Sequence, residues 1–201
     1  MDTSGVIRKL RAFERDRIRD HLLRLGDDDR HLRFGGHATP ERVSAHCAEL
    51  DFAWTIVLGY MVAGAVRGVG ELRPLPGAWP RAAEVAISVE RPFQGQGVGT
   101  ALLRRLTQAA RNRWIRRINM LCLLDNGRMV RLARQLESRL SFDQGQIEAS
   151  IELPWPTGWT LLEEIGGEAG AWWATRPGAA WPACGARSRR ARACADGPSA
   201  A

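Results

Sequence analysis

The residues best suited to chemistry in this 201-residue chain form the glycine-rich run Gln94–Thr100, with the sequence QGQGVGT. Glycines at Gly95, Gly97 and Gly99 let the backbone approach a ligand closely and turn successive N–H groups into one concavity. A helix that begins within the run adds unpaired N–H groups and a partial positive charge at the same place. The run therefore predicts a site for a phosphate or pyrophosphate group.

The segments on both sides of the run have the periodicity needed to position it. Before it, Glu84–Val89 alternates apolar and other residues, which predicts a strand. After it, apolar residues recur on one helical face and basic or amide residues on the other, which predicts an amphipathic helix to about Asn112. The apolar face comprises Leu102, Leu103, Leu106, Ala109 and Ala110, and the opposite face comprises Arg104, Arg105, Gln108 and Arg111.

Single residues argue against two well-known phosphate-binding loops. A P-loop ends in Gly-Lys-Ser/Thr, and this run has no lysine. A dinucleotide-binding fingerprint needs a third glycine where Thr100 stands. The remaining pattern, Gln94-x-x-Gly97-x-Gly99, resembles the acyl-CoA loop of the GCN5-related N-acetyltransferase (GNAT) family. The structural alternative is a glycine-rich turn that only joins a strand to a helix.

The resemblance extends over about residues 5–153. Asp125–Met129 resembles the place where the family has an asparagine before a helix, and Asp29–Phe34 resembles a subgroup of bacterial members. The family's order is strand, two helices, three strands, helix, strand, helix, strand. It implies an α+β fold of three α/β/α layers, with a mixed, mostly antiparallel sheet whose central strands splay apart, over a domain of residues 1–153.

The remaining elements are predicted from periodicity, caps and turn residues. Thr39 as N-cap and Pro40 at the first helical position indicate a helix to about Leu50. The other predicted elements are a strand at Val6–Ala12, a helix at Phe13–Leu25, a short helix after Asp27–Asp29, strands at Trp54–Leu58 and Met61–Val69 around a turn at Gly59–Tyr60, a loop at Leu72–Pro80, a strand at Ile118–Leu124, a helix from about Met129 to Leu136 and a last strand at Gln146–Leu153.

The resemblance implies acetyl-CoA as cosubstrate and acetyl transfer to an amine. The pyrophosphate is expected on the loop residues Gln94, Gly95, Gln96, Gly97, Val98, Gly99 and Thr100. The pantetheine arm is expected to pair with the strand backbone near Ile87 and Val89, where an N–H group would stabilise the oxyanion. Asn126 is expected to bond the pantetheine arm, and a turn or helix cap explains this asparagine equally well.

The amine must lose its proton before it attacks, since lysine-like amines are mostly protonated at pH 7. The family often has an acidic residue where Glu84 stands, which makes Glu84 the candidate base; a solvated carboxylate at a strand end is the alternative, and Glu148 is a second candidate. Arg33 and Phe34, together with His37, are expected to line the acceptor pocket. Arg33 could bind a substrate carboxylate or form a surface ion pair.

One departure from the family keeps a second function open. Many members have a tyrosine, the general acid for the leaving thiolate, where this chain has Ala133. A non-catalytic acyl-CoA-binding or regulatory module is therefore an alternative to an enzyme. A nucleic-acid binder is a third hypothesis, because the formal charge is +7 and the pI is about 10.4. No nucleic-acid module is recognisable, and Lys9 is the only lysine among many arginines.

The rest of the sequence limits location and organisation. It has no apolar run of membrane-spanning length and no apolar leader after Met1, so we expect a cytoplasmic protein with no membrane partner. The resemblance to bacterial family members implies a bacterial protein. The cysteine and histidine spacings indicate no metal site. Residues 154–201, rich in Trp, Gly and Arg, are expected to be a poorly ordered extension with a short helix near Leu161–Ile165. Their tryptophans are expected to pack on the core or on a second copy in a homodimer.

Overall fold

The computed structural model describes most of the first 166 residues. The described residues are 5–78, 81–123, 126–134, 139–143, 146–162, 164 and 166. None of the helices in this part of the chain is both long enough and apolar enough to cross a membrane.

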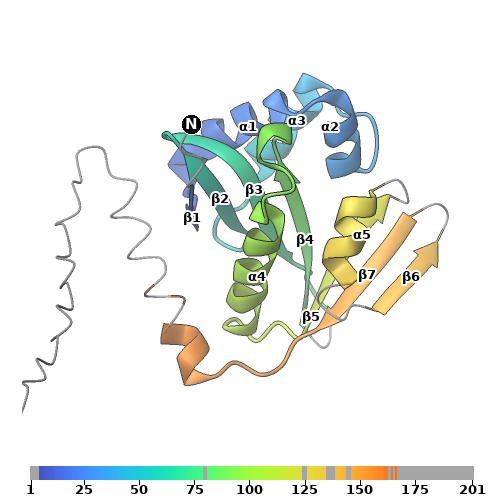
Figure 1. Cartoon of the computed structure of the whole chain (residues 1–201). Helices are drawn as coiled ribbons and strands as arrows, with labels where there is room; N and C mark the ends of the chain where they lie inside the picture. Colours follow the sequence, from blue (N-terminus) through green and yellow to red (C-terminus); the bar gives the residue numbers. More distant parts are fainter. Residues whose placement is uncertain are drawn as a thin grey trace, which may run out of the picture.

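A single mixed sheet forms the centre of the molecule (Figure 1). Its order is β1-β2-β3-β4-β5-β7-β6, and all neighbours are antiparallel except β4 and β5, which are parallel. The strands are β1 (Val6–Lys9), β2 (Ile56–Val62), β3 (Ala65–Pro74), β4 (Ala82–Val89), β5 (Arg117–Leu123), β6 (Arg139–Asp143) and β7 (Gln146–Glu152).

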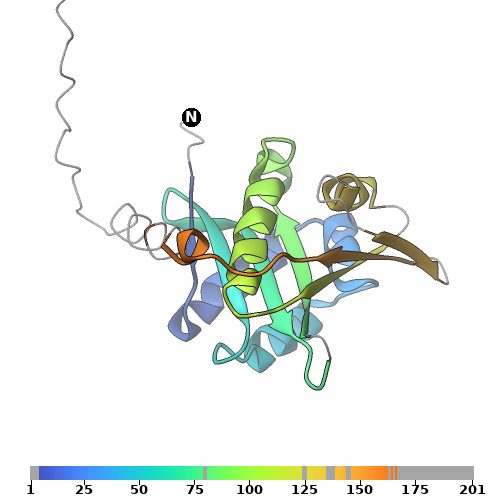
Figure 2. The same ribbon diagram turned by 90° about the horizontal axis from the view of Figure 1, so that it is seen from below.

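Helices cover both faces of the sheet, so the predicted three-layer α+β fold is confirmed (Figures 1 and 2). One apolar core lies between the sheet and α4, with α5 packed at its edge, and a second lies between the sheet and α1 with α3. The helices are α1 (Arg15–Arg24), α2 (Asp27–Phe34), α3 (Pro40–Glu49), α4 (Val98–Arg111) and α5 (Gly127–Arg134), with short 3-10 helices η1 (Ala12–Glu14) and η2 (Arg91–Phe93).

The parallel strands β4 and β5 separate after a short stretch of pairing. Their register comprises only Ala82 with Arg117, Ala83 with Ile118, and Glu84 with Asn119. Beyond Glu84, β4 continues to Val89 while it pairs with β3 alone. The predicted splay of the central strands is therefore present, and it leaves a gap in the middle of the sheet.

Local sequence signals account for several helix ends. Thr39 accepts a hydrogen bond from the backbone N–H of Arg42, and Pro40 is the first residue of α3, as predicted. Gly97, at φ 80°, is the N-cap of α4. At the other end of α2, Gly35 adopts φ 66°, the usual left-handed termination.

The predicted turn at Gly59–Tyr60 is wrong. These residues lie inside β2, and the chain reverses at Ala63–Gly64, where both residues have positive φ, 48° and 79°. Such a pair of angles suits the two-residue turn of a β-hairpin. Gly59 serves packing instead, because a Cβ there would come within 2.8 Å of the Leu10 side chain.

Two further segments differ from the prediction. β3 extends to Pro74 inside the segment predicted as a loop, and it pairs Arg73 with Glu84. Strand β6, which the sequence pattern did not indicate, pairs with β7 at the sheet edge. The last predicted strand is confirmed as β7, with Ile147, Ala149 and Ile151 buried.

The first residues after β7 lie against the C-terminal end of α4 (Figures 1 and 2). The Thr160 hydroxyl donates to Asn112 Oδ1 at 2.9 Å, and the Gln108 side chain donates to the Thr160 carbonyl at 3.1 Å. Trp155 packs edge-on against Trp114 with ring centroids 5.7 Å apart. Residues 158–162 are helical, and the rest of the predicted extension, residues 167–201, lies outside the described residues.

Candidate functional site

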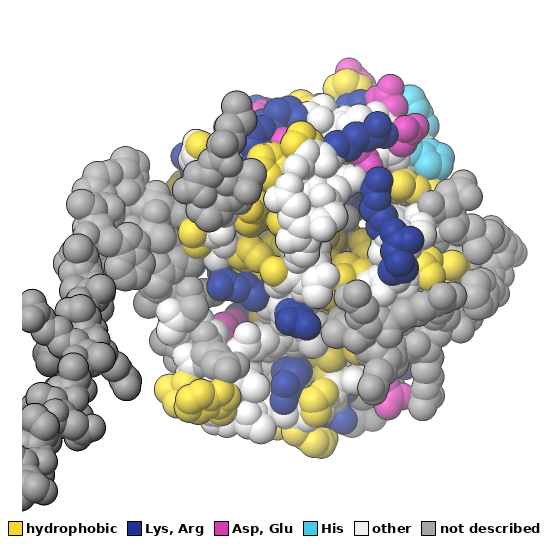
Figure 3. Space-filling view, in the orientation of Figure 1, with side chains coloured by type: hydrophobic (Ala, Val, Ile, Leu, Met, Phe, Trp, Pro, Cys, Tyr) yellow, Lys and Arg dark blue, Asp and Glu magenta, His cyan; other side chains and the backbone are white. Residues whose placement is uncertain are grey.

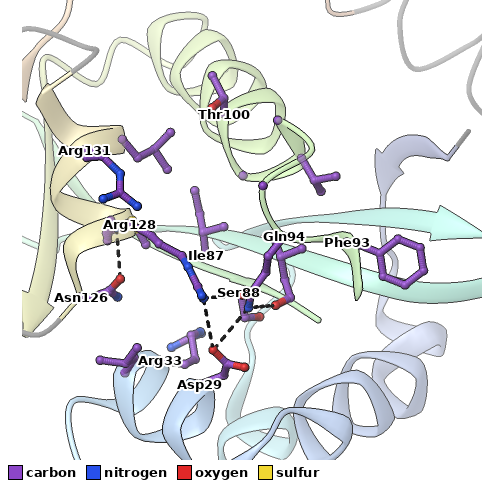
Figure 4. A pocket seen from close by; sticks show the side chains of 18 of the residues that line it. Asp29, Arg33, Ile87, Ser88, Phe93, Gln94, Thr100, Asn126, Arg128 and Arg131 are labelled. Carbon is purple, nitrogen blue, oxygen red and sulfur yellow. Dashed lines mark hydrogen bonds and ion pairs between the residues drawn. The ribbon is translucent and has the colours of Figure 1, made fainter. Parts of the chain in front are cut away.

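A cavity of about 480 Å³ occupies the gap between the splayed strands (Figure 4). Its walls come from α2, the end of β4, the glycine-rich run, the start of α4, and α5. The lining residues are Leu25, Asp29, Leu32, Arg33, Ile87, Ser88, Val89, Phe93, Gln94, Gly95, Gly97, Val98, Gly99, Thr100, Asn126, Arg128, Met129, Arg131 and Leu132. Nine of the ten residues predicted to bind the cofactor are among them, and the exception is Gln96.

The glycine-rich run has the geometry of an anion site. Gly95 and Gly97 adopt φ 74° and 80°, a region that only glycine enters at little cost. The first backbone hydrogen bond of α4 runs from Ala101 N–H to the Gly97 carbonyl at 2.9 Å. The N–H groups of Val98, Gly99 and Thr100 therefore have no acceptor within the helix, and they add to the positive end of its dipole.

The Gln94 side chain connects three walls of the cavity, namely β4, α2 and α5. Its side-chain N–H group donates to the Val89 carbonyl at 2.7 Å and to Asp29 at 3.3 Å, and its carbonyl oxygen accepts from Arg128. Gln96, by contrast, donates to the Pro92 carbonyl at 2.8 Å, is exposed and lies outside the cavity lining. Gln94 therefore shapes the cavity, and the prediction for Gln96 has no support from this geometry.

Charged residues surround the end of the cavity that holds the α4 N-terminus. Arg91 binds Asp28 at 2.9 Å and Asp29 at 3.0 Å, and Arg128 lies 3.8 Å from Asp29. Figure 3 shows basic and acidic side chains next to one another over α2 and toward α5. Arg128 and Arg131 were not predicted as site residues, although their i, i+3 spacing on a helix after the asparagine places both on one face.

The middle of the cavity exposes the backbone of β4. The N–H of Glu90 donates to the Arg67 carbonyl of β3 at 3.0 Å. Because backbone groups alternate sides along a strand, the N–H groups of Ile87 and Val89 point away from β3 and into the gap. They are the strand groups expected to pair with an extended amide-containing ligand.

Asn126 caps α5 and also lines the cavity. Its Oδ1 accepts the Met129 N–H at 3.1 Å, and its backbone carbonyl accepts the Val130 N–H at 3.1 Å. The cap uses the oxygen of the amide and leaves the NH₂ group available. The two roles considered for this residue are therefore compatible.

A second cavity of about 200 Å³ adjoins the first. Glu84, Arg73, Phe34, His46 and Glu71 are among its lining residues, and Leu32 and Arg33 line both cavities. Glu84 is exposed on β4, so its carboxylate is accessible to a ligand there. Glu148, the other candidate base, is exposed on β7 and lines neither cavity.

Arg33 already has a carboxylate partner within the protein. Its Nη2 donates to Glu71 Oε1 at 2.6 Å, and His46 Nε2 lies 3.1 Å from Glu71 Oε2. Burial would raise the pKa of Glu71, but Arg33 and His46 outweigh burial and lower it to about 2. Arg33 therefore forms a buried ion pair, not a surface one. Phe34 packs edge-on against His46 at 5.3 Å.

Comparisons with known proteins agree with the observed fold. A family model described as the acetyltransferase (GNAT) family matches residues 26–137, more than half of the chain. The GNAT domain of S. lividans PAT has a TM-score of 0.65 and 23% identity over 74% of this chain and 90% of that one. The yncA protein of Salmonella typhimurium, solved with its cofactor acetyl-CoA, has a TM-score of 0.58 and 15% identity over 78% and 98%.

A ribosomal-protein-alanine N-acetyltransferase from Brucella melitensis is also similar, with a TM-score of 0.55 and 16% identity over 72% of this chain and 96% of that one. Among proteins of curated function, none matches the sequence. Identities this low establish a common fold and leave the acceptor open. The region matched by the family model includes the glycine-rich run, Glu84 and Asn126.

Proposed function

This chain belongs to the acetyltransferase (GNAT) family, and on that premise we propose that it transfers an acetyl group from acetyl-CoA to a primary amine by direct attack. The cosubstrate follows from the family. The acceptor, a small amine or a protein lysine, and the direct mechanism are our proposal. The observation that carries it is the continuous cavity wall formed by the α4 N-terminus, the open edge of β4 and Asn126.

Each part of acetyl-CoA has a matching part of the wall. The pyrophosphate fits the orphan N–H groups at Val98, Gly99 and Thr100, because anions bind at helix N-termini. The amides of the pantetheine arm fit the free edge of β4 at Ile87 and Val89, where they replace the hydrogen bonds that β5 does not supply. Arg128 and Arg131 add positive charge on the opposite wall.

The second cavity suits the acceptor amine. It adjoins the thioester end of the first cavity through Leu32 and Arg33, and Glu84 is exposed inside it. We assign Glu84 as the general base that takes the proton of the attacking amine. A backbone N–H of β4 then stabilises the oxyanion of the tetrahedral intermediate. The thiolate can leave without a tyrosine because a thiol has a pKa of about 8.5.

The test is release of CoA thiol from acetyl-CoA in the presence of a panel of small amines and lysine peptides, with the acetylated product identified by mass spectrometry. Amine-dependent thiol release supports an N-acetyltransferase. Binding of acetyl-CoA with no acetylated product from any acceptor supports the alternative, a non-catalytic acyl-CoA module, which the missing tyrosine at position 133 favours.

A further inference from the structure

A fully buried histidine of α1 connects a cavity residue to a buried carboxylate. His21 Nε2 lies 2.9 Å from Ser88 Oγ, and His21 Nδ1 lies 3.2 Å from Glu90 Oε1. The His21 side chain has no exposed surface, and Ser88 lines the acyl-donor cavity. The three side chains therefore form a serine–histidine–carboxylate relay that ends in the cavity.

The identity of the partners determines which ring nitrogen carries the proton. The carboxylate of Glu90 can only accept hydrogen bonds, so His21 Nδ1 must be the donor. Burial lowers the pKa of His21 against the opposing effect of Glu90, so the ring is neutral at pH 7 and Nε2 has no proton. The Ser88 hydroxyl must then donate its hydrogen bond to Nε2. This is the tautomer in which a histidine activates a serine.

Glu90 is fixed and stays ionised. Arg24 donates to Glu90 Oε1 at 3.0 Å, and Arg67 donates to Glu90 Oε2 at 3.0 Å. Burial would raise the pKa of Glu90, but His21 and the two arginines together lower it to about 2. The carboxylate therefore holds the His21 ring in one orientation and can stabilise a positive charge on it.

Ser88 is also placed where a thioester carbonyl is expected. It lies on β4 between Ile87 and Val89, whose N–H groups point into the gap and are the candidate oxyanion donors. Ser88 is the one polar side chain among Val85–Val89. If His21 only anchored α1 to the sheet, its acceptor nitrogen would not need to face this side chain.

We propose that Ser88 is a nucleophile for the acyl donor, that His21 is its general base and that Glu90 is the positioning residue, which gives the domain an amine-independent acyl-CoA hydrolase activity. Ser88 Oγ attacks the thioester carbonyl carbon while its proton passes to His21 Nε2. The C–S bond then breaks, the thiolate takes that proton, and CoA leaves as a thiol. Water then attacks the carbonyl carbon of the acyl-serine ester while one of its protons passes to His21 Nε2. The C–Oγ bond breaks, Ser88 Oγ takes that proton back from His21, and the product leaves as acetic acid, which ionises to acetate.

This inference shares the acyl donor with the proposed function and does not depend on an amine acceptor. The full chain is incubated with acetyl-CoA and no amine, and free thiol and acetate are measured together. We expect both products in equal amounts. Acid quenching should trap the mass of one acetyl group on the peptide that contains Ser88, and alkaline hydroxylamine should remove it, because it cleaves an ester and spares an amide.

Variants separate this role from a structural one. Ser88→Ala and His21→Gln should lower the hydrolysis rate by roughly 10²-fold or more, whereas Ser88→Cys should still form a trapped acyl group. Ser44→Ala, which removes an exposed hydroxyl on α3, is the matched control and should hydrolyse acetyl-CoA like the wild type. The wild-type rate should fall in acid as His21 becomes protonated. Circular dichroism checks that each variant is folded.

The outcomes are distinguishable from those of the acetyltransferase test. Amine acetylation without amine-independent hydrolysis overturns the Ser88 proposal alone. Hydrolysis without acetylation of any amine supports it and counts against the proposed function. A Ser88→Ala variant that hydrolyses acetyl-CoA at the wild-type rate, or an acetyl group trapped only on other residues, also overturns it. If Ser88→Ala does not fold, the location of the trapped acetyl group in the wild type decides.

Discussion

Asp29 of α2 lies 3.8 Å from Arg128 of α5, at the end of the cavity that holds the α4 N-terminus. Asp29 also binds Arg91 and Gln94, so one carboxylate holds the basic groups that border the orphan N–H groups of α4. In the proposed binding mode, the carboxylate and the cofactor phosphates compete for the same positive charges. We therefore expect Asp29 to oppose cofactor binding while it orders the site.

Replacing Asp29 with asparagine should strengthen acetyl-CoA binding by a few-fold to about tenfold, because one like charge near the phosphates is removed. The asparagine can still accept a hydrogen bond from Arg91. Isothermal titration calorimetry measures the affinity, and the gain should shrink at high salt. Asp27→Asn is the matched control, since Asp27 is exposed and pairs with Arg30 in the same helix. Equal affinities for wild type and Asp29→Asn would contradict the competition.

The glycine-rich run is tested by Gly97→Trp. The side chain would meet no atom near its Cβ but would cover the N–H groups that we propose hold the pyrophosphate. Acetyl-CoA should raise the melting temperature of the wild type, because it binds only the folded state, and should not raise that of the variant. Gly64→Trp has the same positive φ in the β2–β3 turn and controls for backbone strain of about 1–2 kcal/mol. If both variants keep the shift, the run does not hold the cofactor.

Glu84→Gln tests the general base. Acetyl-CoA affinity should be nearly unchanged, while kcat/KM for the amine falls by roughly 10²–10⁴-fold at neutral pH. The loss should shrink at high pH, where more of the amine is already neutral. Steady-state kinetics across pH measure this, and Glu148→Gln, an exposed carboxylate outside both cavities, is the control. Full activity of Glu84→Gln at all pH values would make Glu84 structural and water the better candidate.

The Glu71 ion pair should appear in the acid stability of the domain. The pKa of Glu71 falls from 4.5 to about 2 on folding, so its contribution to stability is present above pH 4.5 and is lost as the pH falls toward 2. Glu71→Gln should lose about 3–5 kcal/mol at pH 7, because Arg33 is left buried without its carboxylate. It should also depend less on pH between 4.5 and 2. Urea unfolding at several pH values measures both effects; a variant with the wild-type pH profile would contradict the assignment.

The chain after β7 should stabilise the domain without being needed for the fold. A chain ending at Gly166 keeps the contacts of Thr160 with Gln108 and Asn112, whereas one ending at Pro156 loses them. The shorter chain should still fold and bind CoA, and it should be less stable by about 1–3 kcal/mol, since half-buried polar groups of α4 and the residue after it lose these partners. Thr160→Val should lose part of that amount in urea unfolding. An insoluble shorter chain would show that this segment belongs to the core.

Sequence patterns predicted best where one local rule decides the structure. The Thr39–Pro40 cap and the Gln94–Thr100 loop depend on nearest neighbours and agree with the structure. The β2–β3 turn was misplaced because Gly59 resembles a turn residue, while the packing of Leu10 against it is a long-range contact. Strand β6 pairs only at the sheet edge, and its segment shows no alternation strong enough to indicate it.

In the candidate site, too, local features could be predicted from the sequence and long-range contacts could not. The backbone anion site was predictable, because it lies within one short segment. The relay of His21, Ser88 and Glu90 was not, since it joins α1 to β4 across 67 and 69 residues. The only local signal was a histidine on the apolar face of a helix, at a position that is fully buried. The ion pair of Arg33 is a second example, because its partner Glu71 could not be identified from local spacing.

Because β4 and β5 pair over only three residues each, the stability of the domain should depend on whether a ligand occupies the gap between them. Without a ligand, the sheet consists of two parts, β1–β4 and β5–β7–β6, with backbone groups at Ile87 and Val89 that lack a strand partner. In the proposed binding mode, an extended ligand in the gap would complete the sheet and become part of its architecture. The resistance of the whole domain to unfolding should therefore follow the concentration of CoA and its esters around it, so that the protein reports on its own substrate supply through its stability.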